Sequence, residues 1–295
     1  MAVFDSKTLN AKIGGYKLPA DFKCLNLNFL KDLEEKSFED RISCIYNFIL
    51  GKNLPCNAFD KLDLDNFPAS VISVDDGLSV LELFGKTSCN FTDYIFDASS
   101  KESEIVSLAS VLVSAYVDLC SGGVINYGDK INLASDVSDG RILLALYFCK
   151  LIKLPIETLI LGTQKPIDEV YENIFFASPE GDEIDEILSA FFEETEYLLD
   201  PVSASGLIAY DIYYSDYEDG NETLILSLFS PFLFSRKLLN TLTGINEISI
   251  DKSIKKLSEF TAMEVPDSIE SGKTQPFYKS VSEICVKDAL EIIKP

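Results

Sequence analysis

The stretch from Ile131 to Gln164 constrains the fold more than any other part of the chain. It begins with a short apolar strand and a loop, continues as a helix, and ends in a second apolar strand, Ile156 to Leu161. The helix has apolar residues at i, i+4, i+7 and i+10, namely Ile142, Leu146, Cys149 and Ile152. Continuous apolar strands are typical of parallel sheets that are covered on both faces. The pattern therefore predicts a βαβ unit within an α/β fold, with a mostly parallel sheet and helices on both faces.

The composition favours a folded chain with an acidic surface. Hydrophobic residues make up 47% of the 295 residues, which is enough for one large domain or two modest ones. The formal net charge is -23, and the acidic residues are spread along the chain. A surface of this charge repels nucleic acid and anionic lipid. We therefore expect neither a nucleic acid nor a membrane as a partner.

The histidine and cysteine content excludes several kinds of site. The chain has no histidine, which excludes Ser-His-Asp and Cys-His catalysis and every metal site with an imidazole ligand. The seven cysteines are spaced too widely for a Cys-x-x-Cys pair: Cys24, Cys44, Cys56, Cys89, Cys120, Cys149 and Cys285. Most of them lie in apolar segments, so we expect buried, reduced thiols in a cytoplasmic protein and no metal site.

The chain shows no pattern typical of an export or membrane segment. The N-terminal residues lack the long apolar run of a signal peptide. The most apolar run, Ile105 to Cys120, is interrupted by serines and by Asp118, and it is too short to span a bilayer. We expect this run to form a buried helix.

A second strand, turn and helix pattern lies between Ser79 and Asp93. A short apolar strand, Val80 to Phe84, precedes a turn of small residues, Gly85 to Asn90. Such a junction is where α/β proteins commonly build ligand sites. Its sequence, ELFGKTSCNFTD, resembles the lysine motif of the threonine synthase family, which is close to ELFHGPTxAFKD. In this motif, Thr92 stands where the family has the lysine that holds pyridoxal phosphate.

Further segments resemble the same family, in the same order along the chain. Gly14 to Pro19 is similar to the GGLFVP turn near the start of threonine synthases. The segment that follows resembles the family's N-terminal helical subdomain, with Ser37 expected to cap a helix that ends at Leu50. Asp200 to Ser205 resembles the family's Asp/Glu-Pro-His-x-Ala-Val helix start, and Ser230 to Phe234 stands where the family has His-Pro-Ala-Lys-Phe.

The resemblance implies a truncated form of the family's fold, which is fold-type II of the pyridoxal-phosphate enzymes. Residues 1–68 correspond to the helical subdomain, and residues 69–295 correspond to the α/β domain. The family has a whole α/β lobe between the lysine motif and the helix that resumes near Ser103. Here only a short polar linker, residues 97–104, stands in its place. We therefore expect that the central, cofactor-covering lobe is missing.

The residues at the implied cofactor site argue against cofactor binding. The family's Gly-Asn-Phe-Gly phosphate nest aligns with Ser138, Asp139, Gly140 and Arg141. A carboxylate beside a phosphate repels it, and Arg141 offsets this repulsion only in part. The family's threonine at the pyridine nitrogen aligns with Leu228, although Ser227 is adjacent and a slip of one residue is open. We expect no catalytic residue, no pyridoxal phosphate and no metal.

The remaining pattern predicts the outer elements. A hairpin turn is expected at Asp75 to Gly77 and a last core strand at Thr223 to Leu228. Ser178 is expected to cap a helix that buries Ile184, Ile187, Leu188, Phe191 and Phe192. A C-terminal helix is expected from about Tyr278 to Ile293, burying Val281, Ile284, Cys285 and Ala289.

Three functional hypotheses follow from these patterns. The first is a threonine synthase-like pseudoenzyme without catalysis, which binds or regulates a partner. The second is an active enzyme that converts O-phosphohomoserine to threonine with pyridoxal phosphate, which Thr92 opposes. The third is a self-associating protein-interaction module, in which a homodimer or another protein covers the apolar positions Phe91, Val202, Leu228 and Phe229. The alternative for these positions is that the linker of the same chain folds down over them. The sequence does not name a partner or a small-molecule ligand.

Overall fold

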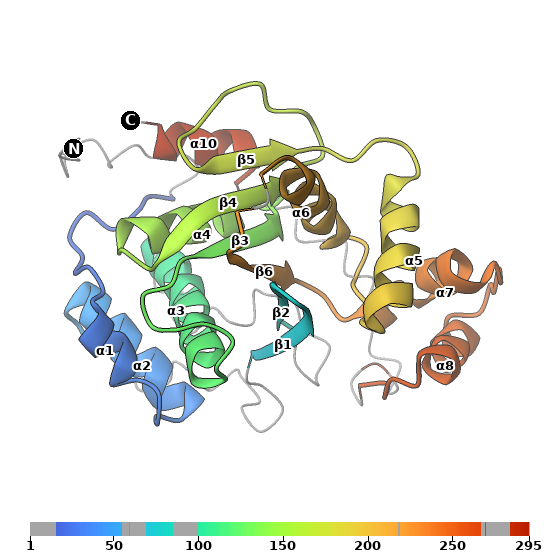
Figure 1. Cartoon of the computed structure of the whole chain (residues 1–295), viewed down its shortest axis with the longest axis horizontal. Coiled ribbons are helices and arrows are strands. Elements are labelled where there is room, and N and C mark those ends of the chain that lie inside the picture. Colours follow the sequence, from blue (N-terminus) through green and yellow to red (C-terminus); the bar gives the residue numbers. More distant parts are fainter. Residues whose placement is uncertain are drawn as a thin grey trace.

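The computed structural model describes residues 16–54, 59, 69–84, 100–217, 219–266, 269 and 284–294. These residues form one six-stranded sheet in the order β1-β2-β6-β3-β4-β5 (Figure 1). The strands are β1 Ser70–Asp75, β2 Leu78–Glu82, β3 Ile131–Asp136, β4 Ile156–Gly162, β5 Ile174–Ala177 and β6 Glu222–Ser227. All neighbouring pairs are parallel except β1 with β2, which are antiparallel. The mostly parallel α/β sheet predicted from the sequence is therefore confirmed.

The hairpin between β1 and β2 turns at Asp76 and Gly77, as predicted. Gly77 has a φ of 76°, in the left-handed region that glycine adopts without strain. The hairpin places β2, with its buried Val80 and Leu81, next to the central strand β6. It thereby adds one antiparallel edge strand to an otherwise parallel sheet.

Helices cover both faces of the sheet. The helices are α1 Leu27–Lys31, α2 Phe38–Leu50, α3 Lys101–Ser121, α4 Gly140–Leu151, α5 Glu183–Thr195, α6 Ala204–Tyr217, α7 Ser235–Thr243, α8 Ile250–Thr261 and α10 Val286–Ile293, with a 3₁₀ turn at Pro231–Phe234. In Figure 1, α3, α4 and α10 lie on one side of the sheet, while α6 lies on the other side and α5 packs against it. α2 packs against α3, and Phe29 of α1 stacks on Phe48 of α2. α7 and α8 pack together beyond α5.

Alternate residues of the central strands supply the two cores. Leu159 and Leu161 of β4 join the core of α3 and α4, whereas Ile160 between them joins the core of α5 and α6. Leu224 and Leu226 of β6 alternate with Ile225 in the same way. Side chains along a strand point to opposite faces in turn, so a strand that is apolar throughout needs cover on both sides. This confirms the interpretation of the apolar runs.

The helix α3 corrects the expected linker. Residues 101–104 are its first turn, and the Ser100 side chain caps it by accepting a hydrogen bond from the Ser103 backbone N–H at 3.1 Å. The sequence there is polar because the first turn of a helix favours acidic residues and a serine cap, not because the chain is irregular. Residues 97–99 lie outside the described part. The prediction of a linker over residues 97–104 is therefore wrong for its second half.

The same helix is long and apolar enough to cross a membrane, judged by length and composition alone. However, 89% of its most apolar window is buried inside the protein. It packs against α2 and α4 and is a core helix, as the sequence pattern predicted.

Several predicted boundaries need correction. The helix α5 begins at Glu183 and its N-cap is Asp182 rather than Ser178. Of the five residues expected to be buried, Leu188 and Phe191 are buried, and Ile184, Ile187 and Phe192 are partly buried. The strand β6 ends at Ser227, one residue before the predicted end. The C-terminal helix begins at Val286, so Ile284 precedes it and Cys285 is its exposed N-cap. Tyr278 and Val281 lie outside the described residues. By contrast, α2 is capped by Ser37 and ends at Leu50, as predicted.

The cysteines are less buried than the sequence suggests. All five in the described part are free thiols, but only Cys149 is buried, while Cys24 and Cys285 are exposed. Cys24 lies in a segment without regular secondary structure before α1. Cys285, which the pattern placed on the buried face of the C-terminal helix, is instead the N-cap that precedes α10. Cys56 and Cys89 lie outside the described residues.

Candidate functional site

The candidate site is the edge of the sheet where the parallel strands end. Register pairs Glu82 of β2 with Ser227 of β6, and Asp136 of β3 with Gly162 of β4. Ligands of open α/β sheets bind at this edge, beyond the carboxyl ends of the strands. Two carboxylates of the strand ends therefore lie at the place where a site is expected.

The first turn of α6 packs directly against this edge. A Cβ added at Gly162 would lie 2.3 Å from the backbone carbonyl carbon of Ser205. A Cβ added at Gly206 would lie 2.7 Å from the backbone carbonyl carbon of Ser135. Both distances are far below any real contact of a Cβ, so glycine is required at each position. The two glycines bring the start of α6 into backbone contact with β3 and β4.

The turn before α6 is organised by the fully buried carboxylate of Asp200. Its Oδ1 accepts hydrogen bonds from the backbone N–H groups of Val202 and Ser203, both at 3.0 Å. Its Oδ2 accepts from Ser203 Oγ at 2.5 Å and from the Phe229 backbone N–H at 3.3 Å. Burial raises the pKa of Asp200 to about 6, against the lowering effect of these hydrogen bonds. Asp200 thereby ties the start of α6 to the end of β6.

A second buried carboxylate, Asp136, organises the loop between β3 and α4. It accepts hydrogen bonds from the Ser138 backbone N–H at 2.9 Å, from Ser138 Oγ at 3.1 Å and from Ser205 Oγ at 2.6 Å. Burial raises the pKa of Asp136, although the hydrogen bonds from Ser205 and Ser138 oppose this. Because its donors come from both the loop and α6, Asp136 joins the β3–α4 loop to the start of α6.

Glu82 completes the row of acidic groups at this edge. The Tyr197 hydroxyl donates a hydrogen bond to Glu82 Oε1 at 3.0 Å. Burial raises the pKa of Glu82, and this hydrogen bond acts in the opposite direction. Across the edge, Glu82, Asp136 and Asp200 each make hydrogen bonds within the protein, which favours a structural role for each.

The backbone N–H groups of the β3–α4 loop donate within the protein. Val137 donates to the Gly162 carbonyl at 3.0 Å, and Arg141 donates to Asp139 Oδ1 at 2.9 Å. Gly140 donates to the carbonyl of Ile284 at 3.0 Å, just before α10. A Cβ at Gly140 would lie 2.6 Å from the carbonyl oxygen of Cys285. The missing side chain at Gly140 therefore makes room for the C-terminal segment, which occupies the space a ligand would need. The start of α4, an anion site in many helices, is already capped by these acceptors.

The charge beside this loop is also balanced within the protein. Arg141 forms a two-point ion pair with Asp139, at 3.1 Å from Nε and 2.6 Å from Nη2 to Oδ2. Its Nη1 lies 4.0 Å from Glu104, whose other neighbours include the Tyr16 hydroxyl at 2.8 Å. Burial, together with the hydrogen bond to Glu104, raises the pKa of Tyr16 to about 12. The guanidinium is therefore already paired with carboxylates.

These residues do not fit the phosphate of a pyridoxal cofactor. A phosphate nest needs backbone N–H groups that point at the ligand and a favourable local charge. Here the N–H groups of Ser138, Gly140 and Arg141 are bound to a carboxylate, a carbonyl and a carboxylate. The sequence had already indicated a negative charge that repels a phosphate. The structure adds that the backbone N–H groups of the loop are bonded within the protein.

The other predicted site positions are only partly described. Leu228 is buried, and its backbone N–H donates to Ser203 Oγ at 2.8 Å. Val202 and Phe229 are partly buried against the core of α3 and α4, and Phe229 packs edge-on against Phe234. Thr92 and Phe91 lie outside the described residues. Within the described ranges, no group of three or more acidic or thiol side chains is placed to hold a metal ion.

Comparison with solved structures identifies the fold. The chain matches threonine synthase from Escherichia coli with a TM-score of 0.62 at 12% identity, over 88% of this chain and 91% of that chain. It matches threonine synthase from yeast with a TM-score of 0.63 at 14% identity, over 86% and 91% of the two chains. The chain has the fold of the threonine synthases.

A third threonine synthase structure agrees with this result. The pyridoxal-phosphate-bound enzyme from Brucella melitensis matches with a TM-score of 0.61 at 13% identity, over 87% of this chain and 95% of that chain. No family model matches the chain, and no curated protein matches its sequence. The chain therefore shares the threonine synthase fold at 12–14% sequence identity, and an identity this low does not by itself indicate the activity.

Sequence reasoning missed several contacts that shape this edge of the threonine synthase fold. It placed Asp200 and Ser203 at a helix start but not their hydrogen bonds, which the pattern of a polar residue that caps a helix could have indicated. Tyr197 precedes them and gave no such signal. The contact between Ile284 and Gly140 joins residues far apart in the sequence, and no local pattern predicts it.

Proposed function

We propose that this protein is a threonine synthase-like pseudoenzyme that binds no pyridoxal phosphate and acts as a binding or regulatory protein. The observation that carries this proposal is the hydrogen bonding of the β3–α4 loop. The start of α4 is capped by the Asp139 carboxylate and by the carbonyl of Ile284. A phosphate would have to displace both acceptors and overcome the repulsion of Asp136 and Asp139.

The sequence supports the same proposal by a separate observation. Thr92 stands at the position of the family's Schiff-base lysine, and a threonine hydroxyl cannot form an imine with an aldehyde cofactor. Two independent features, one in the sequence and one in the hydrogen bonding of the β3–α4 loop, thus oppose cofactor chemistry. The free thiols of the described cysteines support a cytoplasmic location for such a protein.

The first test of the proposal is a mixture of the purified protein with pyridoxal phosphate. We expect no visible absorbance band that grows to one equivalent per chain. Treatment with borohydride should fix no stoichiometric adduct, because neither a Schiff-base lysine nor a phosphate site is expected to retain the cofactor. Peptide mapping by mass spectrometry provides the readout. A one-to-one adduct at a single lysine would refute the proposal.

A second prediction concerns the substitution Thr92→Lys. We expect this variant to form no threonine from O-phosphohomoserine and pyridoxal phosphate, because the occupied β3–α4 loop would still leave the cofactor without a phosphate site. Amino-acid analysis of the reaction measures the product, with threonine synthase from Escherichia coli as the positive control. Threonine formation above the level of the unaltered protein would show that the remaining site is competent.

Self-association through the expected apolar patch gains no support. Leu228 is 1% exposed within a single chain, and Val202 and Phe229 are partly buried by the protein's own core. Because these contacts are made within the chain, this part of the patch has no need of a second copy. A homodimer over the rest of the patch stays a prediction, and the binding role is assigned below to a separate cavity.

A further inference from the structure

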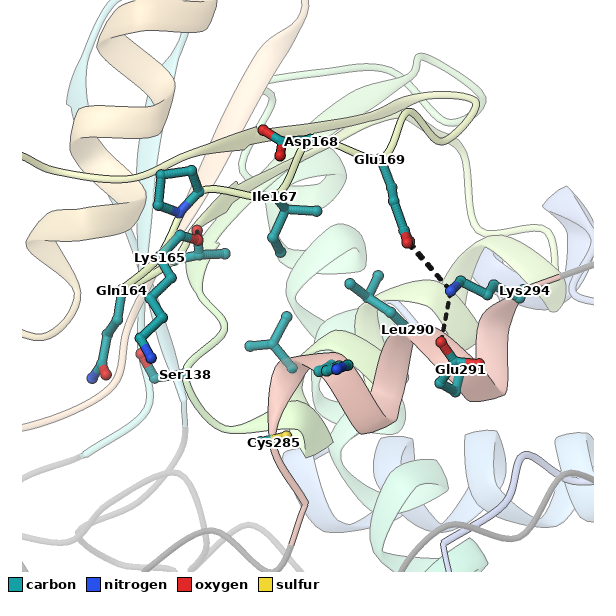
Figure 2. A pocket seen from close by; sticks show the side chains of 14 residues that line it. Ser138, Gln164, Lys165, Ile167, Asp168, Glu169, Cys285, Leu290, Glu291 and Lys294 are labelled. Atoms are coloured by element: carbon teal, nitrogen blue, oxygen red, sulfur yellow. Dashed lines mark hydrogen bonds and ion pairs between the residues drawn. The ribbon is translucent and has the colours of Figure 1, made fainter.

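A cavity lies beside the candidate site, between the β4–β5 connection and α10. Its volume is about 610 Å³, within the range of small-molecule sites. Figure 2 shows the connection, residues 163–169, on one side and α10 on the other. Ser138 of the β3–α4 loop also lines the cavity.

The cavity wall combines an apolar surface with separate charged groups. Its apolar side chains come from both sides and are Pro166, Ile167, Val286 and Leu290. Ile167 and Val286 are half-buried and Leu290 is buried, so the apolar part is held by the fold. An apolar body of a ligand would therefore be taken out of water along this wall.

One ammonium bridges two of the three acidic groups of the wall. Lys294 lies 2.6 Å from Glu291 and 3.4 Å from Glu169, so one ammonium joins both carboxylates across the cavity. Figure 2 shows this bridge, and it shows Asp168 with its carboxylate directed away from α10. The bridge leaves one net negative charge at this end of the cavity, and the Asp168 carboxylate is turned away from α10.

Two ammonium groups of the wall are left without an ion pair. Within the described residues, Lys165 and Lys287 make no salt bridge or hydrogen bond with their ammonium groups, and both are exposed. Lys287 still acts at longer range on Glu169, because its charge adds to the Tyr171 and Lys294 hydrogen bonds that lower the pKa of that carboxyl. In Figure 2 the Lys165 side chain points toward Ser138. In a chain with 48 acidic and 25 basic side chains, an anion meets repulsion over most of the surface. This cavity is a place where cations and apolar surface come together.

We propose that this cavity binds a small aliphatic carboxylate, with its charge on Lys165 and Lys287 and its body against Ile167, Val286 and Leu290. The inference rests on the binding role proposed above and names a site and a ligand class for it. A monocarboxylate suits the cavity better than a phosphate ester. The N–H groups of Ser138 and Gly140 in the neighbouring loop are already bonded within the protein, so they cannot bind a phosphate. The surrounding carboxylates would also repel the dianion of a phosphate ester more strongly than a monoanion.

The test uses octanoate as the probe and calorimetric titration of the full chain as the measurement. We expect saturable binding of octanoate at one site per chain, weakened by added salt. Octylamine has the same apolar body with the opposite charge, and it should not bind at this site. Equal binding of octylamine, or no saturable binding of octanoate, would overturn the inference.

Charge-reversal variants locate the site. Lys165→Glu and Lys287→Glu should each weaken octanoate binding by about tenfold, the effect of roughly 1.4 kcal/mol. Lys255→Glu on α8 makes the same change at an exposed lysine far from the cavity and should bind like the unaltered protein. Circular dichroism confirms that each variant is folded. Unchanged affinity in both cavity variants would contradict the assignment.

A thiol provides a readout that is specific to this cavity. Cys285 is exposed and lines the wall, whereas Cys24 is exposed elsewhere. Octanoate should slow alkylation of Cys285 and leave that of Cys24 unchanged. If neither rate changes, the inference fails. That failure leaves the proposed pseudoenzyme intact, since the pseudoenzyme is tested separately by the absence of a pyridoxal phosphate adduct.

Discussion

Replacing Gly162 with alanine should destabilise the protein by about 4 kcal/mol or more, a loss found only when a substitution meets a specific structural conflict. The new Cβ would lie 2.3 Å from the backbone carbonyl carbon of Ser205. Backbone atoms cannot rotate aside as a side chain can, so either the start of α6 or the end of β4 would have to move. Urea denaturation measures the loss as a fall in the transition midpoint.

Gly181→Ala is the matched control for this prediction. Gly181 has a φ of 57°, but nothing lies within 4 Å of an added Cβ. The control therefore carries only the strain of the left-handed conformation, about 1–2 kcal/mol. If both variants unfold at the same urea concentration, the close approach of α6 to β4 is not as tight as described.

The second large effect is the pH dependence that Asp200 confers on stability. Burial raises its pKa from 3.8 to about 6 in the folded protein. The folded state therefore holds this proton more tightly than the unfolded chain does. The stabilising contribution is complete below about pH 4 and is lost as pH rises through about 6. A shift of this size corresponds to about 3 kcal/mol.

Asp200→Asn removes this ionisation and keeps the size of the side chain. The unfolding free energy of the unaltered protein, minus that of the variant, should fall by about 3 kcal/mol between pH 4 and pH 7. Asp211→Asn on the exposed face of α6 controls for the loss of one negative charge. Urea denaturation at several pH values gives the comparison. A difference that stays constant, or that grows with pH, would contradict the assignment of the raised pKa to Asp200.

The parts of the fold that follow from local pattern could be predicted from the sequence. The β3–α4–β4 unit and the helix α2 are examples, because an apolar run or a capped apolar face specifies each element within a short window. The start of α3 could not be separated from a linker, since a capped first turn and a polar connection have the same composition. The start of α5 was misplaced for a related reason, because its N-cap Asp182 makes no side-chain capping bond.

The candidate site depended more on contacts between distant residues. The sequence located the β3–α4 loop and its acidic character, but not the carbonyl of Ile284 that bonds Gly140. It also placed Asp200 at a helix start without showing that the carboxylate would reach the Phe229 backbone. Such pairings are set by how α6 and α10 pack on the sheet, which no single segment encodes. The position of Thr92 could be assigned only by resemblance to the family motif.

Hydrogen–deuterium exchange of the β3–α4 loop tests the central claim most directly. The account predicts that the amides of Ser138, Gly140 and Arg141 exchange slowly in the free protein, because their N–H groups are bonded internally. Addition of pyridoxal phosphate should leave these rates unchanged. Rapid exchange in the free protein, followed by strong protection when pyridoxal phosphate is added, would contradict the account.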